Sequence, residues 1–256
     1  MRTHEQTVQQ QFDPRAEAYR VSAVHAAGPD LVHAEALVRH AAARTDEALD
    51  VGCGAGHLAF TLAPHFGHTV ALDPSPSMRA MVSAGALERN LRQIEVSAGQ
   101  ATSLPFDTGR FALVCTRYSA HHWTALEAAL QEMGRVLRPG GHALIIDTLA
   151  GEDVLTDTYL QAMELLRDVS HVRNRSVGEW RSLLRAAGFA ELEYRLWPTH
   201  LQFAAWVARM DTPAERIAAI RSLQNAAPRE VRDTLAIEED GSFSIRTALF
   251  WLRKAA

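Results

Sequence analysis

The sequence is poor in the features that mark several specialised protein classes. It has two cysteines among 256 residues, Cys53 and Cys115, and neither has a metal-type partner nearby, so a disulfide framework and a metal site are both unexpected. No apolar run approaches the roughly 18 residues of a membrane-spanning helix. The net charge is −4, so no basic surface for nucleic acid is expected. The polar N-terminal residues lack the apolar segment of a signal peptide, which favours a cytoplasmic protein.

Short apolar segments alternate with helical patterns through the first 150 residues. The predicted strands cover 47–51, 68–73, 94–99, 111–116 and 142–147. Strands that alternate with helices at this spacing form right-handed βαβ units, in which the strands are parallel. Hydrophobic content of 47% and charged content of 22% are ordinary for a globular domain. The expected fold class is therefore α/β, with a Rossmann-like, doubly wound sheet.

The pattern changes after residue 150. Helical periodicity returns over 153–167 and 203–234, a sixth strand is predicted at 191–197, and 235–252 is interpreted as a hairpin. The sheet is thus expected to have seven strands, mostly parallel, with an antiparallel C-terminal hairpin.

Two helix starts carry a recognisable signal. Thr124 and Ser176 are each followed three residues later by Glu. This is the pattern of a capping box, in which the two residues satisfy free backbone N–H groups reciprocally. We expect helices to begin at both positions.

Three glycines at alternate positions follow the first strand, in the stretch ALDVGCGAG at 48–56. Glycine tolerates positive φ and lets a ligand approach the backbone, so Gly52, Gly54 and Gly56 predict a tight strand-to-helix turn. In open α/β sheets the ligand binds beyond the carboxyl ends of the strands. Asp73, at the end of the second strand, is therefore expected at the same site, where a carboxylate can accept bonds from ribose hydroxyls.

The spacing of the glycines helps to separate two nucleotide-like ligands. A dinucleotide fingerprint has the form GxGxxG, but position 57 of this chain is His. Asp50 would also repel a pyrophosphate, whereas it would attract the ammonium group of an amino acid. These residues favour S-adenosylmethionine. Two alternatives stay open: a dinucleotide-dependent oxidoreductase and a non-catalytic protein that binds S-adenosylmethionine.

Four stretches carry a family resemblance: LDVGCGAGHLA, VALDPSPSMRAMV, ATSLPF with GRFALVCTRYSAHHW, and EMGRVLRPGGHALIID. They resemble successive motifs of class I S-adenosylmethionine-dependent methyltransferases, nearest to the branch related to ubiquinone and menaquinone C-methyltransferases. The resemblance covers about residues 45 to 150. It implies methyl transfer from S-adenosylmethionine to a small-molecule acceptor, and it says almost nothing about which acceptor.

The resemblance also implies roles for single residues. Asp50 would lie near the ammonium group and Asp73 at the ribose hydroxyls, with the glycine turn against the methionine and ribose. Ser75 and Met78 would flank the adenine. Relatives commonly have Asp where this chain has Gln100, whose amide oxygen can still accept from the adenine amino group. The expected cofactor-binding residues are Asp50, Gly52, Cys53, Gly54, Gly56, Asp73, Pro74, Ser75, Met78, Gln100, Ala101, Thr102, Thr116 and Arg117.

Methyl transfer needs little chemistry from a protein beyond positioning the acceptor and removing a proton. His121 and His122 are the candidate catalytic residues, because a histidine with a pKa near ~6.5 can act as a base at neutral pH. The alternative is that one caps a helix and the other makes a structural hydrogen bond. The expected acceptor contacts are Tyr19, His25, Tyr118, Trp123 and His171.

The chain is expected to form one methyltransferase domain. Its predicted parts are an N-terminal helical arm (1–44), a cofactor-binding core (45–150), helical insertions that form a substrate lid (151–188 and 198–234) and the C-terminal hairpin (235–256). The expected partners are a small-molecule acceptor and, in addition, a second copy in a homodimer, without nucleic acid or a membrane.

Overall fold

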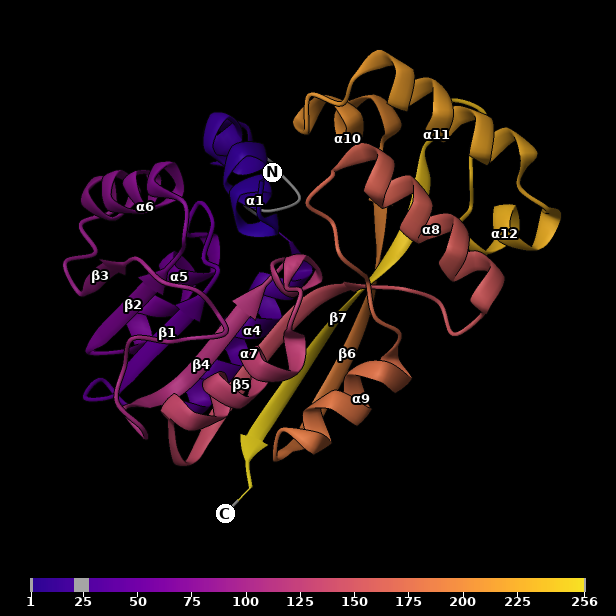
Figure 1. Cartoon of the computed structure of the whole chain (residues 1–256). Coiled ribbons are helices and arrows are strands. Elements are labelled where there is room, and N and C mark those ends of the chain that lie inside the picture. The colour runs from indigo at the N-terminus through magenta and orange to yellow at the C-terminus, as the bar shows by residue number, and fades with distance from the viewer. Residues whose placement is uncertain (1, 21–27, 256) are drawn as a thin grey trace.

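A seven-stranded sheet forms the centre of the molecule, with the strand order β3-β2-β1-β4-β5-β7-β6 (Figure 1). It is seen in a computed structural model that describes residues 2–20 and 28–255. The strands are β1 Glu47–Val51, β2 His68–Leu72, β3 Ile94–Ser97, β4 Phe111–Arg117, β5 Leu137–Leu149, β6 Phe189–Leu201 and β7 Phe243–Lys254. The first five are parallel, and β7 runs antiparallel to both β5 and β6. The predicted fold class is confirmed.

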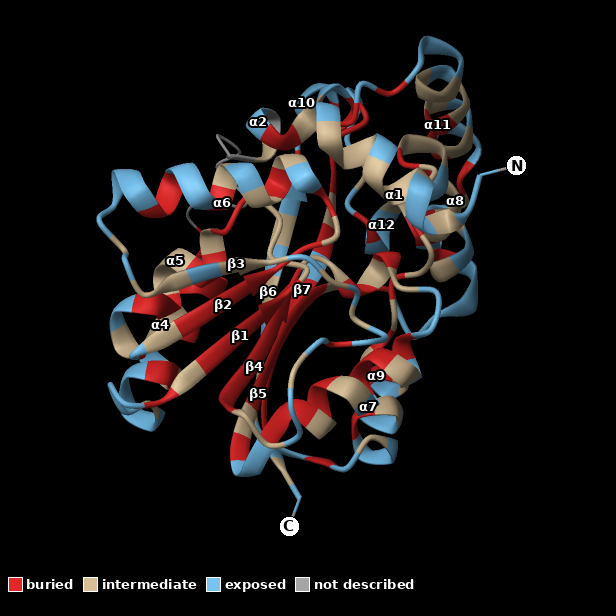
Figure 2. Ribbon diagram, turned by 60° about the vertical axis from the view of Figure 1, so that its left-hand side comes forward, coloured by how far each residue is buried: buried red, intermediate tan, exposed pale blue. Residues whose placement is uncertain are grey.

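The described chain has α-helices on both faces of this sheet, in the N-terminal arm and in a layer beyond one end of the sheet. They are α1 His4–Phe12, α2 Ala16–Arg20, α4 Pro29–Ala41, α5 His57–Leu62, α6 Pro76–Glu88, α7 Leu126–Val136, α8 Val154–Arg167, α9 Val177–Ala186, α10 Phe203–Arg209, α11 Ala214–Ala226 and α12 Arg229–Thr234. One apolar cluster joins α7 and α9 to the sheet, and other clusters join α4, α5 and α6 to it. The central strands are consequently buried on both sides (Figure 2). Such strands are nearly continuous apolar runs, which is why they were visible in the sequence.

Helices α8, α10, α11 and α12 form a separate layer, here called the cap. The β6–β7 ribbon supports it, because this ribbon continues past the end of β5: Leu149 of β5 pairs with Arg246, while the ribbon extends to the pair Leu201 and Phe243. The cap lies over that end of the sheet (Figure 1). It has a hydrophobic core of its own, which includes Trp206 and Ile220.

The predicted hairpin within 235–252 is wrong. β7 is a single strand, and its antiparallel partner is β6, which lies before the cap helices in the chain. Asp240 and Gly241 do form a turn, in which the Asp240 carboxylate accepts from the Ser242 N–H at 2.8 Å. That turn leads from α12 into β7. A turn signal is local, whereas the choice of partner strand depends on residues some fifty positions away.

One of the two predicted capping boxes is present. The Ser176 hydroxyl accepts from the Glu179 N–H at 3.3 Å, and the Glu179 carboxylate accepts from the Ser176 N–H at 2.8 Å. The box at Thr124 is absent, because the N-cap of α7 is Ala125, one residue later than expected, and α7 has no side-chain cap.

We predict that Ser176→Ala lowers the free energy of unfolding by about 1 kcal/mol, because it leaves the Glu179 N–H at the start of α9 without its acceptor. Thr124→Ala is the matched control and should change it by less than about 0.5 kcal/mol. Urea unfolding followed by circular dichroism measures both. Equal losses in the two variants would contradict the assignment of the caps.

Candidate functional site

The glycine turn after β1 is bonded to the end of the neighbouring strand. The N–H groups of Gly52 and Cys53 both donate to the Leu72 carbonyl, at 2.8 and 3.0 Å. Gly52 has a φ of +68°, and a Cβ there would come within 2.1 Å of the Ser119 hydroxyl. A Cβ at Gly54, where φ is +52°, would meet nothing within 4 Å. The turn therefore presents bare backbone to open space.

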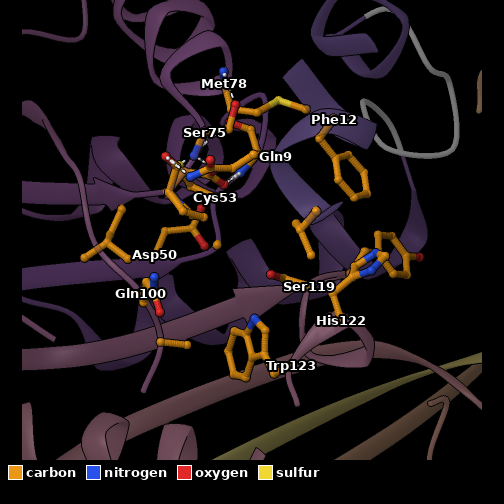
Figure 3. A pocket seen from close by; sticks show the side chains of 18 of the residues that line it. Gln9, Phe12, Asp50, Cys53, Ser75, Met78, Gln100, Ser119, His122 and Trp123 are labelled. Atoms are coloured by element: carbon orange, nitrogen blue, oxygen red, sulfur yellow. Dashed lines mark hydrogen bonds between the residues drawn. The ribbon is translucent and has the colours of Figure 1, made fainter. Parts of the chain in front are cut away.

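That open space is a cavity beyond the carboxyl ends of β1, β2 and β4, here called the main cavity (Figure 3). Its lining comes from the sheet end and from the N-terminal helix. The lining residues are His4, Glu5, Val8, Gln9, Phe12, Tyr19, Asp50, Gly52, Cys53, Gly54, Ala55, His57, Leu58, Leu72, Asp73, Pro74, Ser75, Met78, Gly99, Gln100, Ala101, Thr102, Arg117, Tyr118, Ser119, His122, Trp123 and Thr124.

Asp73 is held by two backbone N–H groups. Its Oδ2 accepts from Gly54 at 2.9 Å and its Oδ1 accepts from Ser75 at 2.8 Å. Burial raises the pKa of Asp73, and the two backbone bonds act against that rise. Each oxygen keeps a lone pair, so the carboxylate could accept from two neighbouring ribose hydroxyls without moving.

Asp50 lies in the same cavity, where a backbone contact with Ala59, the charge of Arg117 and the Cys115 thiol offset only part of the cost of its burial. It is 1% exposed, and in the described part of the chain neither carboxylate oxygen has a hydrogen-bond partner. Burial raises its pKa to about 7, and the nearby Asp73 contributes to the rise. A buried carboxylate without a partner is costly, and an ammonium group from a ligand would remove that cost.

The N-terminal arm closes over the main cavity, and sequence reasoning did not foresee how closely. The Gln9 side-chain amide donates to the Pro74 carbonyl at 3.4 Å, and the Ser75 hydroxyl donates to the Asp13 carboxylate. The His4 ring nitrogen lies 3.0 Å from the His122 carbonyl oxygen. Helix α1 is polar and short, so nothing in its own pattern indicates which surface it covers.

His121 and His122 have opposite environments. His121 Nδ1 lies 2.6 Å from Asp147 Oδ1, and His122 Nδ1 lies 2.9 Å from the Ser170 carbonyl oxygen. Burial works against the charged form of His121, but Asp147 outweighs it, so the pKa of His121 lies above its usual value. Burial, with the charge of His121, lowers the pKa of His122 to about 4. His122 is therefore neutral at pH 7.

A second cavity adjoins the main cavity, between the sheet end, the arm and the cap. The two cavities share the side chains of Phe12, Tyr19, Tyr118 and His122. The complete lining of the second cavity is Phe12, Tyr19, Tyr118, His121, His122, Thr148, Glu164, Arg167, Thr199, Leu201, Trp206, Arg209 and Ile245. The cap residues among them were missed, since helix periodicity does not tell which polar side chains face inward.

Comparison with known proteins decides the family. A family model described as "Methyltransferase domain" matches residues 48–141. The uncharacterised protein YafE of Escherichia coli is 39% identical over 205 residues, which cover 80% of this chain and 99% of YafE. YcgJ of Bacillus subtilis, an uncharacterised methyltransferase, is 34% identical over 88% of each chain. The chain belongs to the S-adenosylmethionine-dependent methyltransferases.

A solved structure and a more distant relative agree with this family. The crystal structure of YcgJ matches this methyltransferase with a TM-score of 0.81 at 31% identity, covering 88% of this chain and 99% of YcgJ. A demethylmenaquinone methyltransferase of Lactococcus lactis is 29% identical over 57% of this chain and 67% of its own length. The predicted family and cofactor are confirmed, so S-adenosylmethionine is favoured over a dinucleotide.

Most of the expected cofactor-binding residues of the methyltransferase line the main cavity, and two do not. Gly56 turns toward α5 and α6, where a Cβ would come within 2.9 Å of the Phe60 ring. Thr116 is buried inside β4, and side-chain alternation places it on the face opposite to Arg117. Arg117 does line the cavity, and its Nε also donates to the buried Asp30 carboxylate.

Some of the residues expected to contact the acceptor line a cavity and others do not. Tyr19 and Tyr118 line both cavities, and Trp123 lines the main one. His171 lines neither, because its Nε2 points to the Gln161 amide oxygen at 2.8 Å; burial lowers its pKa to about 2. His25 lies outside the described residues.

The described residues also bear on the expectations for a metal site and for a membrane span. Over 2–20 and 28–255, no three His, Cys, Asp or Glu side chains are grouped so that they could hold a metal ion. Within the same ranges, no helix is long and apolar enough to cross a bilayer.

The unpaired Asp50 makes stability depend on pH. Burial raises the pKa of Asp50 from an ordinary value of ~4 to about 7 in the folded protein. The folded protein is therefore most stable, as far as Asp50 is concerned, below pH ~4, and this stability is lost as pH rises to about 7. Without cofactor, Asp50→Asn should therefore gain stability relative to the natural protein between pH 5 and 8, by up to roughly 4 kcal/mol. Urea unfolding at several pH values measures this, with the exposed Asp233→Asn as control. A gain that does not depend on pH would contradict the assignment.

Proposed function

We propose that this methyltransferase transfers a methyl group from S-adenosylmethionine to a small-molecule acceptor bound in the second cavity. The observation that carries the proposal is the wall shared by the two cavities, formed by Phe12, Tyr19, Tyr118 and His122. Because the two cavities adjoin at these side chains, an acceptor in the second cavity would lie next to a cofactor in the main cavity. When bound, the cofactor supplies a methyl carbon activated by its sulfonium. The protein has to hold the two molecules in line and exclude water.

The cofactor would be held mainly by the two buried carboxylates. Asp50 accepts from the ammonium group, and Asp73 accepts from the ribose hydroxyls. Gln100, in the lining of the main cavity, accepts from the adenine amino group. The open face of Gly54 supports this placement, because a side chain there would occupy the ligand's space.

His121 would act as the general base. Its Nδ1–H donates to Asp147, which leaves the lone pair on Nε2. Nε2 would take the proton that the acceptor loses on methylation, and the Asp147 carboxylate would stabilise the imidazolium that results. His122 stays neutral and positions the acceptor from the shared wall.

In this proposal, the cap and the arm form a lid over the acceptor. Both contribute to the second cavity, through Phe12 and Tyr19 from the arm and Trp206 and Arg209 from the cap. The acceptor is expected to be a small molecule rather than nucleic acid, since no N/D-P-P-Y/F stretch is present and the net charge is −4. A homodimer and a cytoplasmic location stay predictions.

We expect Asp73→Asn to weaken binding of S-adenosylhomocysteine by about ten- to a hundredfold, because two hydrogen bonds to a charged acceptor become bonds to an amide. Calorimetry measures the dissociation constant. Asp233→Asn, on the exposed surface of α12, is the control and should bind as the natural protein does. Unchanged binding in Asp73→Asn would remove Asp73 from the site.

A second expectation concerns the pH profile. A base with a raised pKa is active only when deprotonated, so kcat/KM should fall as pH falls through an apparent pKa above ~6.5. His121→Gln should lower kcat by about 10²- to 10⁴-fold. In Asp147→Asn, the fall of kcat/KM should occur at a lower pH, because the substitution removes the charge that raises the pKa of His121.

The assay is homocysteine release over a panel of small acceptors, with the exposed His200→Gln as control. A profile that is identical in the natural protein and Asp147→Asn would contradict the role of His121. Tight binding of S-adenosylhomocysteine without turnover of any acceptor would indicate the non-catalytic alternative.

A further inference from the structure

Two arginines of the cap, Arg167 and Arg209, line the second cavity from the ends of α8 and α10. Neither has a part in the chemistry proposed above. Arginine is rarely placed inside a protein unless an acceptor for its five N–H groups is present. The two side chains therefore indicate what the cavity binds.

Arg167 is held in place by the protein itself. Its Nε donates to the Trp206 carbonyl at 3.0 Å, and its guanidinium carbon lies 5.1 Å from the centre of the Trp206 ring. The nearest carboxylate, that of Glu164, is 3.7 Å from its Nη1, which is too long for a hydrogen bond. The orientation of Arg167 is thus set before any ligand binds, and part of its donor capacity remains unused.

Arg209 is half-buried, and within the described ranges its guanidinium makes no hydrogen bond and no ion pair. Burial and the neighbouring charge of Arg167 both lower its pKa. Two guanidinium groups repel each other, and the repulsion is strongest where water is scarce. The Glu164 carboxylate, 3.7 Å from Arg167, acts on both arginines but carries only one charge. An anion between them would remove the cost.

The other residues that line the second cavity indicate what the ligand carries besides an anionic group. Most of it is apolar or aromatic, with Phe12, Leu201, Trp206 and Ile245 as its main members. Such a surface fits a ring or a short aliphatic chain. His122 lies on the side shared with the main cavity, and the ring of His121 is 4.3 Å from it, so the nucleophile belongs at that end.

We propose that the second cavity binds an acceptor that carries a carboxylate, held by Arg167 and Arg209, on a compact apolar body. This assignment rests on the proposed function, since it names the class of its acceptor. Glu164 is the carboxylate that lines the cavity, so the two arginines exceed it by one positive charge. A monoanion balances that excess, whereas a phosphate dianion would exceed it by one negative charge. The carboxylate anchors the acceptor at the cap and leaves the nucleophile toward His121.

The test measures binding to the protein saturated with S-adenosylhomocysteine. The probes are hydroxybenzoic and hydroxyphenylacetic acids, their primary amides and phenyl phosphate. We expect at least one acid to bind ten- to a hundredfold more tightly than its own amide, and Arg209→Gln to abolish that difference. Arg209→Lys should keep part of it. Arg229→Gln, which removes the same charge from an exposed site on α12, should keep all of it.

Two results would overturn the assignment: no acid binds more tightly than its amide, or Arg209→Gln retains the preference. Tighter binding of phenyl phosphate than of every acid would also overturn it. Unchanged binding of S-adenosylhomocysteine in Arg209→Gln shows that the variant is folded.

Homocysteine release separates this assignment from the proposed function. Turnover of neutral acceptors that is unaffected by Arg209→Gln would refute the carboxylate and leave methyl transfer standing. Arg209-dependent binding of an acid without turnover of any acceptor would support the carboxylate site and contradict the proposed methyl transfer.

Discussion

Two buried carboxylates at the ends of adjacent strands set the conditions for the rest of the site. The glycine turn is bonded to the end of β2, and this contact brings Asp50 and Asp73 into one cavity. Like charges in a buried space are unfavourable, and each raises the cost of ionising the other. Asp73 accepts two backbone hydrogen bonds, whereas within the described residues Asp50 has no partner at hydrogen-bond distance. The apo protein thus carries an electrostatic cost at Asp50 that a cationic amino-acid group relieves, so affinity is obtained at the expense of stability.

The second cavity depends on a different constraint, namely how the cap is attached to the sheet. The β6–β7 ribbon extends past β5 and holds the cap over the carboxyl end of the sheet. The second cavity therefore lies between a rigid sheet and a layer with its own core. Substitutions in the cap can change the second cavity without disturbing the main cavity, because the two linings share only Phe12, Tyr19, Tyr118 and His122.

That wall contains a backbone outlier. Tyr118 directly follows β4 with a φ of +53°, a left-handed conformation that costs a bulky residue about 1–2 kcal/mol. Its N–H donates to the Ile146 carbonyl at 2.9 Å, and its hydroxyl lies 3.3 Å from the Thr247 hydroxyl. Neighbouring strands thus hold the residue in place. The strain is maintained where the chain passes between the two cavities, both of which Tyr118 lines.

The sequence by itself determined the sheet class, the glycine turn, the two carboxylates and the family. These features are local: buried parallel strands are apolar runs, the turn needs glycine, and motif spacing is written in consecutive residues. It did not determine the partner of β7, the docking of α1, the pairing of His121 with Asp147 or the inward side of the cap arginines. Each of these joins residues far apart in the chain, and their patterns are compatible with several partners. Only packing in three dimensions selects one, because burial and charge compensation are satisfied by the whole molecule and not by any segment alone.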